Sequence, residues 1–168
     1  MMTRKYSWII IVFFLITSCV SKKEEGVIIS DATLISMLQP VSSFTYYRNS
    51  NDTLDAMSPS PHFFYVRVRF NPKALSVLND SVSDLNASVF PDESMVVKEV
   101  YDERGGALQS YAVMFKMRNA ANSGSGWVWS EYGPDGSIRY SAGLTGGNCV
   151  SCHSSPTNSD LVKTFGLH

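Results

Sequence analysis

Five residues near the C-terminus constrain the fold of this chain more than any other feature. They read Cys149-Val150-Ser151-Cys152-His153, and the C-x-x-C-H pattern is typical of c-type haem attachment. The spacing suits this chemistry because two thiols must reach two vinyl groups on one porphyrin edge, and the next residue must place an imidazole on the iron. A short helical turn does this. The pattern predicts one covalent haem c, held by Cys149 and Cys152 with His153 as axial iron ligand, and the fold must supply an apolar pocket for it.

Other paired-cysteine sites agree less well with the sequence. A redox dithiol is expected in a thioredoxin-type βαβ unit, and no such pattern surrounds the motif. A zinc site wants about four ligands, yet only His62 and His168 remain as further histidines, and the third cysteine lies far away at the N-terminus. A structural disulfide between the two cysteines, without haem, stays open as an alternative.

The N-terminus is typical of an export signal. Positive charges at Arg4 and Lys5 precede an apolar run over residues 8–16, which is too short to span a bilayer. The run ends in Ile16-Thr17-Ser18-Cys19, which resembles a bacterial lipobox, in which the cysteine is lipidated and becomes the new N-terminus. An ordinary secretory signal is the alternative. Export also suits haem attachment, since c-type haem is attached outside the cytoplasm.

Three segments follow from this interpretation. We expect a lipoprotein signal peptide over residues 1–18, a lipidated tether over residues 19–30 and a single haem domain over residues 31–168. The protein would then be lipid-anchored through Cys19 in the bacterial cell envelope, on the periplasmic or outer face. A net charge of −1 argues against electrostatic binding of nucleic acid.

Alternating hydrophobicity predicts a sheet. Apolar and mixed side chains alternate through residues 62–70, and the Asn71-Pro72 pair that follows predicts a helix through about residue 78. Asp31 is expected to cap a short helix over residues 32–39. Further strands are expected over residues 94–101, 110–118, 127–132 and 137–140. The order predicts an α+β, β-dominated fold: an antiparallel sheet with a few short helices and a C-terminal haem-binding helical turn.

Several short segments resemble the cytochrome P-460 family, which includes the cytochromes c′-β. They are Val68-Arg69-Phe70-Asn71-Pro72, Phe90-Pro91-Asp92 with Val96-Val97-Lys98-Glu99 after it, Gly126-Trp127, and residues 148–153 with Asp160-Leu161-Val162 after them. The resemblance implies a β-sheet haem protein, usually a homodimer, with a five-coordinate iron held by His153. One branch of the family joins a lysine to the porphyrin and oxidises hydroxylamine. The other branch lacks that bond and binds nitric oxide.

The residue that matches the cross-linking lysine is Lys98. An edge-strand surface lysine is the alternative. Hydroxylamine-oxidising members also carry an acidic residue in the loop after the third strand, where it would accept protons. Residues 118–122 contain no carboxylate. This departure favours gas binding or a modified reaction, and the sequence does not decide whether the protein is an enzyme.

Phe64 and Phe70 are the predicted aromatic residues of the distal pocket. A sixth protein ligand is the main alternative, and it would make the protein an electron-transfer cytochrome with six-coordinate haem. The candidates for that ligand are His62, Met57, Met95, Met114 and Met117. The expected partners are hydroxylamine or nitric oxide, a redox partner cytochrome and the membrane, without nucleic acid.

Overall fold

The computed structural model describes residues 26–56, 60–62 and 65–167. The predicted signal peptide, the lipidated Cys19, Met57 and Phe64 lie outside the described residues. Within the described part of the chain, no helix is long and apolar enough to cross a membrane.

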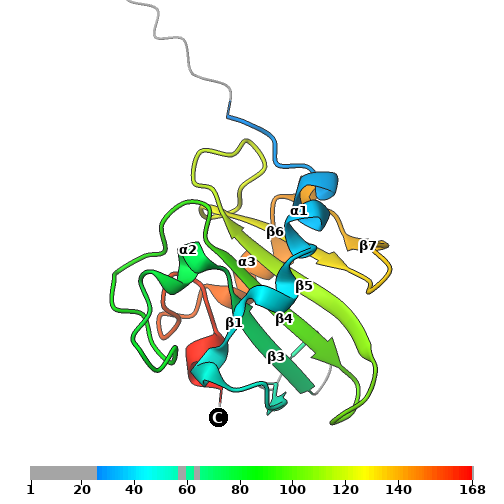
Figure 1. The fold of residues 1–168 in the computed structure, drawn as a ribbon. Helices are drawn as coiled ribbons and strands as arrows, with labels where there is room; N and C mark the ends of the chain where they lie inside the picture. The colour runs from blue at the N-terminus through cyan, green and yellow to red at the C-terminus, as the bar shows by residue number, and fades with distance from the viewer. Residues whose placement is uncertain (1–25, 57–59, 63–64, 168) are drawn as a thin grey trace, which may run out of the picture.

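An antiparallel sheet forms the centre of the molecule (Figure 1). The described residues give it seven strands, of which six follow the order β1-β3-β4-β5-β6-β7 while β2 pairs with β3 beside this path. Their bounds are β1 Thr45–Tyr46, β2 Leu54–Asp55, β3 Tyr65–Phe70, β4 Met95–Tyr101, β5 Leu108–Lys116, β6 Trp127–Tyr132 and β7 Ile138–Tyr140. The predicted α+β, β-dominated fold is confirmed.

The helices are short. In the described residues they are α1 (Asp31–Leu38), α2 (Pro72–Leu75) and α3 (Gly147–His153), with 3-10 turns at Val41–Ser43, Tyr47–Asn49, Ala142–Leu144 and Thr164–Gly166. The predicted cap of α2 is confirmed, since the Asn71 side chain accepts a hydrogen bond from the N–H of Ala74. The helix nevertheless ends at Leu75, before residue 78, and Leu78 instead forms a β-bridge with Leu85.

The predicted cap of α1 is wrong. Ser30 is the N-cap, and its Oγ accepts a hydrogen bond from the N–H of Thr33 at 3.1 Å. Asp31 is the first helical residue, and its carboxylate accepts bonds from Tyr132 Oη and from the N–H of Ala142, both at 2.8 Å. Asp31 therefore ties the start of α1 to the sheet and to the segment that leads into α3.

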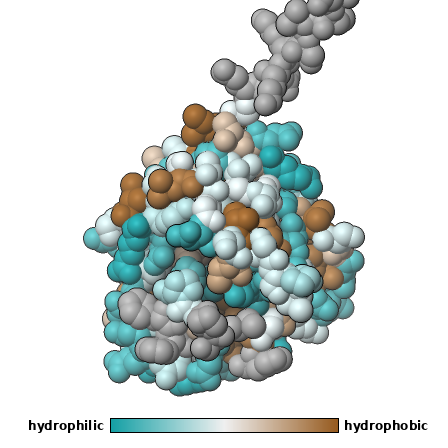
Figure 2. All heavy atoms as spheres, turned by 180° about the vertical axis from the view of Figure 1, so that it is seen from behind, coloured by the Kyte–Doolittle hydropathy of each residue, from teal (hydrophilic) through white to brown (hydrophobic). Residues whose placement is uncertain are grey.

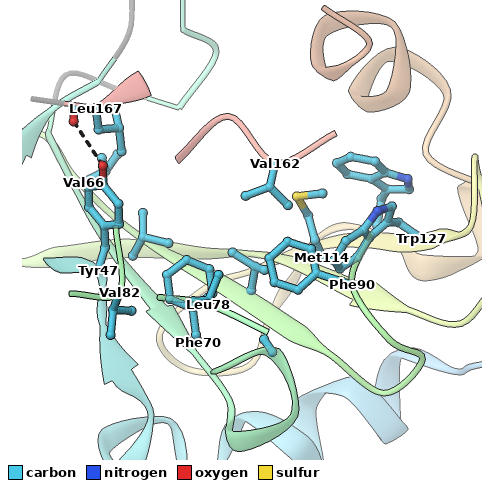
Figure 3. Packing of buried hydrophobic residues seen from close by; sticks show 14 residues of the cluster. Tyr47, Val66, Phe70, Leu78, Val82, Phe90, Met114, Trp127, Val162 and Leu167 are labelled. Atoms are coloured by element: carbon cyan, nitrogen blue, oxygen red, sulfur yellow. Dashed lines mark hydrogen bonds between the residues drawn. The ribbon is translucent and has the colours of Figure 1, made fainter. Parts of the chain in front are cut away.

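The two faces of the sheet are covered by different parts of the chain. Helix α1 packs Leu34 and Leu38 on one face, and α3 with the C-terminal segment covers the other (Figure 1). Side chains alternate along each strand, so each of the long strands contributes to both faces. The core on the α3 face includes Phe70, Met114, Trp127 and Val162 (Figure 3). Seen from the α3 side, the surface carries small, separate apolar patches in a largely polar surround (Figure 2).

Candidate haem site

A cavity of about 270 Å³ lies between the sheet and α3. Its sheet wall is largely apolar and includes Val66, Val96, Ala112, Met114 and Trp129. The opposite wall comes from α3 and from the C-terminal segment through Lys163, Thr164 and Leu167. The C-terminal segment also contacts Tyr47, the residue that follows β1, because Tyr47 Oη donates a hydrogen bond to the Leu167 carbonyl (Figure 3).

The three residues of the motif that are predicted to hold the haem line this cavity. Cys149 is half-buried, Cys152 is exposed and His153 is buried. The two thiols are free in the structure. One turn of α3 therefore presents two sulfur atoms and an imidazole to the same space, as the spacing of the motif predicts.

The ring of His153 is held from two sides. Its Nδ1 lies 2.7 Å from the carbonyl oxygen of Leu161, and Trp129 packs its edge against the ring at a centroid distance of 4.9 Å. A carbonyl only accepts hydrogen bonds, so Nδ1 carries the proton and Nε2 keeps a free lone pair. Burial lowers the pKa of His153 to about 4, against the opposing effect of the Leu161 bond. The ring is thus neutral near pH 7, the form that binds a metal.

Lys98 extends from the centre of the sheet wall. It lies in a row of paired residues that crosses four strands, from Val68 through Lys98 and Ala112 to Glu131. Burial and the neighbouring Lys163 lower the pKa of Lys98 to about 8. Lys98 therefore lines the cavity with an amine that deprotonates more readily than an exposed lysine, and the surface-lysine alternative does not fit this position.

Glu131 is a cavity residue that the sequence interpretation did not find. Its Oε1 accepts a hydrogen bond from Ser110 Oγ at 2.6 Å, and its Oε2 lies 3.8 Å from Nδ1 of His62. Burial lowers the pKa of His62 to about 3, so the imidazole is neutral and this contact is no charged pair. Glu131 lies on β6, outside the loop of residues 118–122 in which the resemblance places an acidic residue. The sequence signal for it is the alternation along β6, which places Glu131 on the same face as Trp127 and Trp129.

The other predicted pocket residues divide between the wall and the core. Phe70 lies in the core and does not line the cavity; its ring stacks with those of Phe90 and Phe165 at 6.4 and 6.2 Å. Among the described candidates for a sixth ligand, His62 and Met114 line the cavity. Met95 and Met117 pack instead on the α1 face.

These residues fit a haem. The sheet wall is largely apolar, the two thiols and one imidazole meet on one side, and His62 Nδ1 is buried without a hydrogen-bond partner. The described residues contain no cluster of three or more His, Cys, Asp or Glu side chains placed to hold a metal ion.

A family model described as cytochrome P460 matches residues 45–164, from β1 to the turn after α3. The chain belongs to the cytochrome P460 family. Membership makes it a haem-binding cytochrome, and the predicted resemblance is confirmed. The C-x-x-C-H motif lies within the matched residues. None of the curated proteins compared with the chain matches it.

Proposed function

We propose that this cytochrome P460 protein holds one haem covalently through Cys149 and Cys152, with His153 Nε2 on the iron, and leaves the other side of the haem to hydroxylamine or nitric oxide. The observation that carries the proposal is the shared cavity, in which the attachment motif faces Lys98 and Glu131. When bound, the haem supplies a redox-active iron. The protein supplies its ligand, its apolar surroundings and a proton acceptor.

Glu131 supports oxidation of hydroxylamine over simple gas binding. Oxidation releases protons together with electrons, and a carboxylate in the cavity can take a proton as a general base. The hydrogen bond from Ser110 holds one oxygen in place, so the other stays directed toward His62 and the cavity. The carboxylate that hydroxylamine-oxidising members of the family carry in a loop would then come from β6 in this chain.

Lys98 is the candidate for the lysine that is joined to the porphyrin in one branch of the family. Its depressed pKa leaves a share of neutral amine near pH 8, and the neutral amine is the nucleophilic form. Lys163 lines the same cavity and provides a matched control, because its Nζ lies 3.6 Å from Cys152 Sγ rather than on the sheet wall.

A six-coordinate electron-transfer cytochrome is the second candidate function. It is favoured by His62, whose ring nitrogen Nδ1 is buried and unpartnered within the described structure. In that case His62 or Met114 would occupy the iron position that hydroxylamine needs.

The deciding experiment combines a haem stain with spectroscopy. After denaturing electrophoresis the wild-type chain should stain for haem and a Cys149→Ser/Cys152→Ser variant should not. The reduced wild-type protein should show high-spin features and bind nitric oxide. A low-spin spectrum that ignores nitric oxide, restored to high-spin by His62→Ala or Met114→Ala, would establish the electron-transfer alternative.

Two substitutions test the proposed hydroxylamine oxidation and the proposed bond between Lys98 and the porphyrin. Glu131→Gln should lower hydroxylamine turnover about 10²- to 10⁴-fold, the usual contribution of a positioned base, while nitric oxide binding persists. Lys98→Met should remove a red-shifted, broadened Soret band, and Lys163→Met should not. Unchanged turnover in Glu131→Gln would refute the assigned base, and an ordinary c-type spectrum in the wild type would refute the lysine bond.

The location in the cell is a separate proposal. The lipobox-like sequence supports an envelope lipoprotein anchored through Cys19. Labelling with a fatty acid in a bacterial host should mark the wild-type chain and not a Cys19→Ser variant.

A further inference from the structure

A buried ion pair lies beside the haem cavity. Nζ of Lys116, at the end of β5, is 2.8 Å from Oδ1 of Asp160, and the two side chains are 4% and 9% exposed. Asp160 makes two more bonds: its Oδ2 accepts from the N–H of Phe90 at 2.8 Å, and its carbonyl accepts from Trp127 Nε1 at 3.0 Å. Three residues that lie 33, 44 and 70 positions before Asp160 in the chain therefore hold this one residue.

Stability alone does not account for this arrangement. Burying two charges costs so much desolvation that an apolar pair of similar size often serves as well or better. The backbone adds to the cost, because Asp160 and Leu161 have φ values of 48° and 69°. Two successive non-glycine residues in the left-handed region are strained, and such strain persists only where the surroundings impose it.

The strained turn determines the position of the Leu161 carbonyl group. Ser159 and Val162 form an antiparallel bridge that closes the turn, and Val162 points into the core toward Phe90 and Met114 (Figure 3). Leu161 lies between these fixed points, and its carbonyl oxygen is 2.7 Å from Nδ1 of His153. The backbone angles of Asp160 and Leu161 decide where that oxygen points.

We propose that Lys116 and Asp160 are positioning residues that hold the Leu161 carbonyl as hydrogen-bond acceptor for His153 and thereby set the electron donation of this imidazole to the haem iron. An accepted N–H bond raises the basicity of a metal-bound imidazole and fixes its orientation, and hydrogen bonding around the ligands tunes the reduction potential of a haem. The proposal rests on the proposed function in one respect, that His153 is the axial ligand.

The test uses the full-length, haem-loaded protein with Lys116→Met and Asp160→Asn. Each variant should weaken the Leu161–His153 bond, favour ferrous iron and raise the reduction potential. We expect at least a tenfold change in the ratio of reduced to oxidised protein at a fixed potential, which is 59 mV for a one-electron couple. The iron–histidine stretching frequency of the ferrous protein, measured by resonance Raman spectroscopy, should fall in the same variants.

Arg69 and Glu99 provide a matched control. They form a second buried ion pair, with Nε and Oε1 2.7 Å apart and side chains 12% and 6% exposed. They neighbour Val68 and Lys98 in sequence, so their side chains leave the opposite face of the sheet. Arg69→Met and Glu99→Gln should lower stability without moving the potential or the stretching frequency.

Each outcome decides. Equal potentials in wild type and Lys116→Met, or equal shifts in both sets of variants, would overturn the proposal. If Lys116→Met does not fold, Lys116→Gln gives the same reading, and Lys116→Arg should keep the wild-type potential because it keeps the charge. A wild-type haem that binds neither nitric oxide nor hydroxylamine would refute the proposed function and leave the potential shift intact. A wild-type chain without haem would overturn both.

Discussion

Gly146 stands immediately before α3, where the chain enters the haem motif. Its φ is 74°, and a Cβ atom built on it would lie 2.1 Å from Cδ1 and 2.6 Å from Nε1 of Trp129. The indole has little room to move, since Trp129 is buried, its Nε1 donates to the Gly124 carbonyl at 3.0 Å and its edge packs on His153. Gly146→Ala should therefore disturb both the start of α3 and the ring of His153.

The cost of Gly146→Ala has two parts. An L-residue in the left-handed region loses about 1–2 kcal/mol, and forcing an extra methyl group into a packed core costs about 1–3 kcal/mol. Together they predict a loss of about 2–5 kcal/mol, which is large against the roughly 5–15 kcal/mol that stabilises an ordinary domain. Gly147→Ala is the matched control, because the nearest atom to its added Cβ lies 3.8 Å away. An alanine at this helical position should change stability by less than about 1 kcal/mol.

Urea unfolding followed by far-ultraviolet circular dichroism measures these differences. Repeating Gly146→Ala in a Trp129→Leu background separates the two parts, because the smaller side chain removes the collision and leaves the backbone strain. The cost of Gly146→Ala should then fall to about 1–2 kcal/mol. An unchanged cost in that background would show that Trp129 is not what the methyl group meets.

Two further predictions concern the charge of Lys98 and the N-cap of α2, Asn71. In a Cys149→Ser/Cys152→Ser background, which carries no covalent haem, Lys98 should titrate with a pKa lowered from 10.5 to about 8. The unfolded chain then binds more protons between these values, so the unfolding free energy should rise with pH from about 8 to 10.5, by up to about 3 kcal/mol. Lys98→Met should lack this rise, and parallel pH profiles of the two proteins would contradict the buried-amine assignment. Asn71→Ala removes an acceptor for one N–H in α2 and another at the start of β4, so chemical denaturation should report a loss of about 1–2 kcal/mol, most of it recovered by Asn71→Asp.

The sequence predicts the long strands well, because their runs of β-branched and aromatic residues favour extended backbone even where, as in β4 and β6, both faces are buried. Strand β6 has the predicted bounds, Trp127–Tyr132, and α3 coincides with the predicted turn. Strands β1 and β2 are not among the strands that the sequence predicts. They have two residues each, too few to show any period, and they exist because β3 offers them hydrogen-bonding partners.

Only part of the site can be predicted from short sequence segments and from the family resemblance. The cysteines and His153 follow from five consecutive residues, and Lys98 follows from the family resemblance. Glu131 is missed because a charged residue in a strand normally indicates solvent, and only the register with Lys98 and Ala112 places it in the cavity. The partnership of Lys116 with Asp160 spans 44 positions along the chain and depends on how the C-terminal segment folds back, which no local pattern encodes.

The row of residues across the sheet wall also sets a size limit. Ala112 separates Lys98 from Glu131, so these two cavity side chains leave strands that are two spacings apart, roughly 9.6 Å. Between them the wall carries only the methyl group of Ala112, which is the shortest side chain of the three. A substitution of Ala112, whose side chain has no polar group, can therefore change the space available to a ligand. A graded series at residue 112, from glycine through valine to leucine, would sort ligands by size while Lys98 and Glu131 stay unchanged.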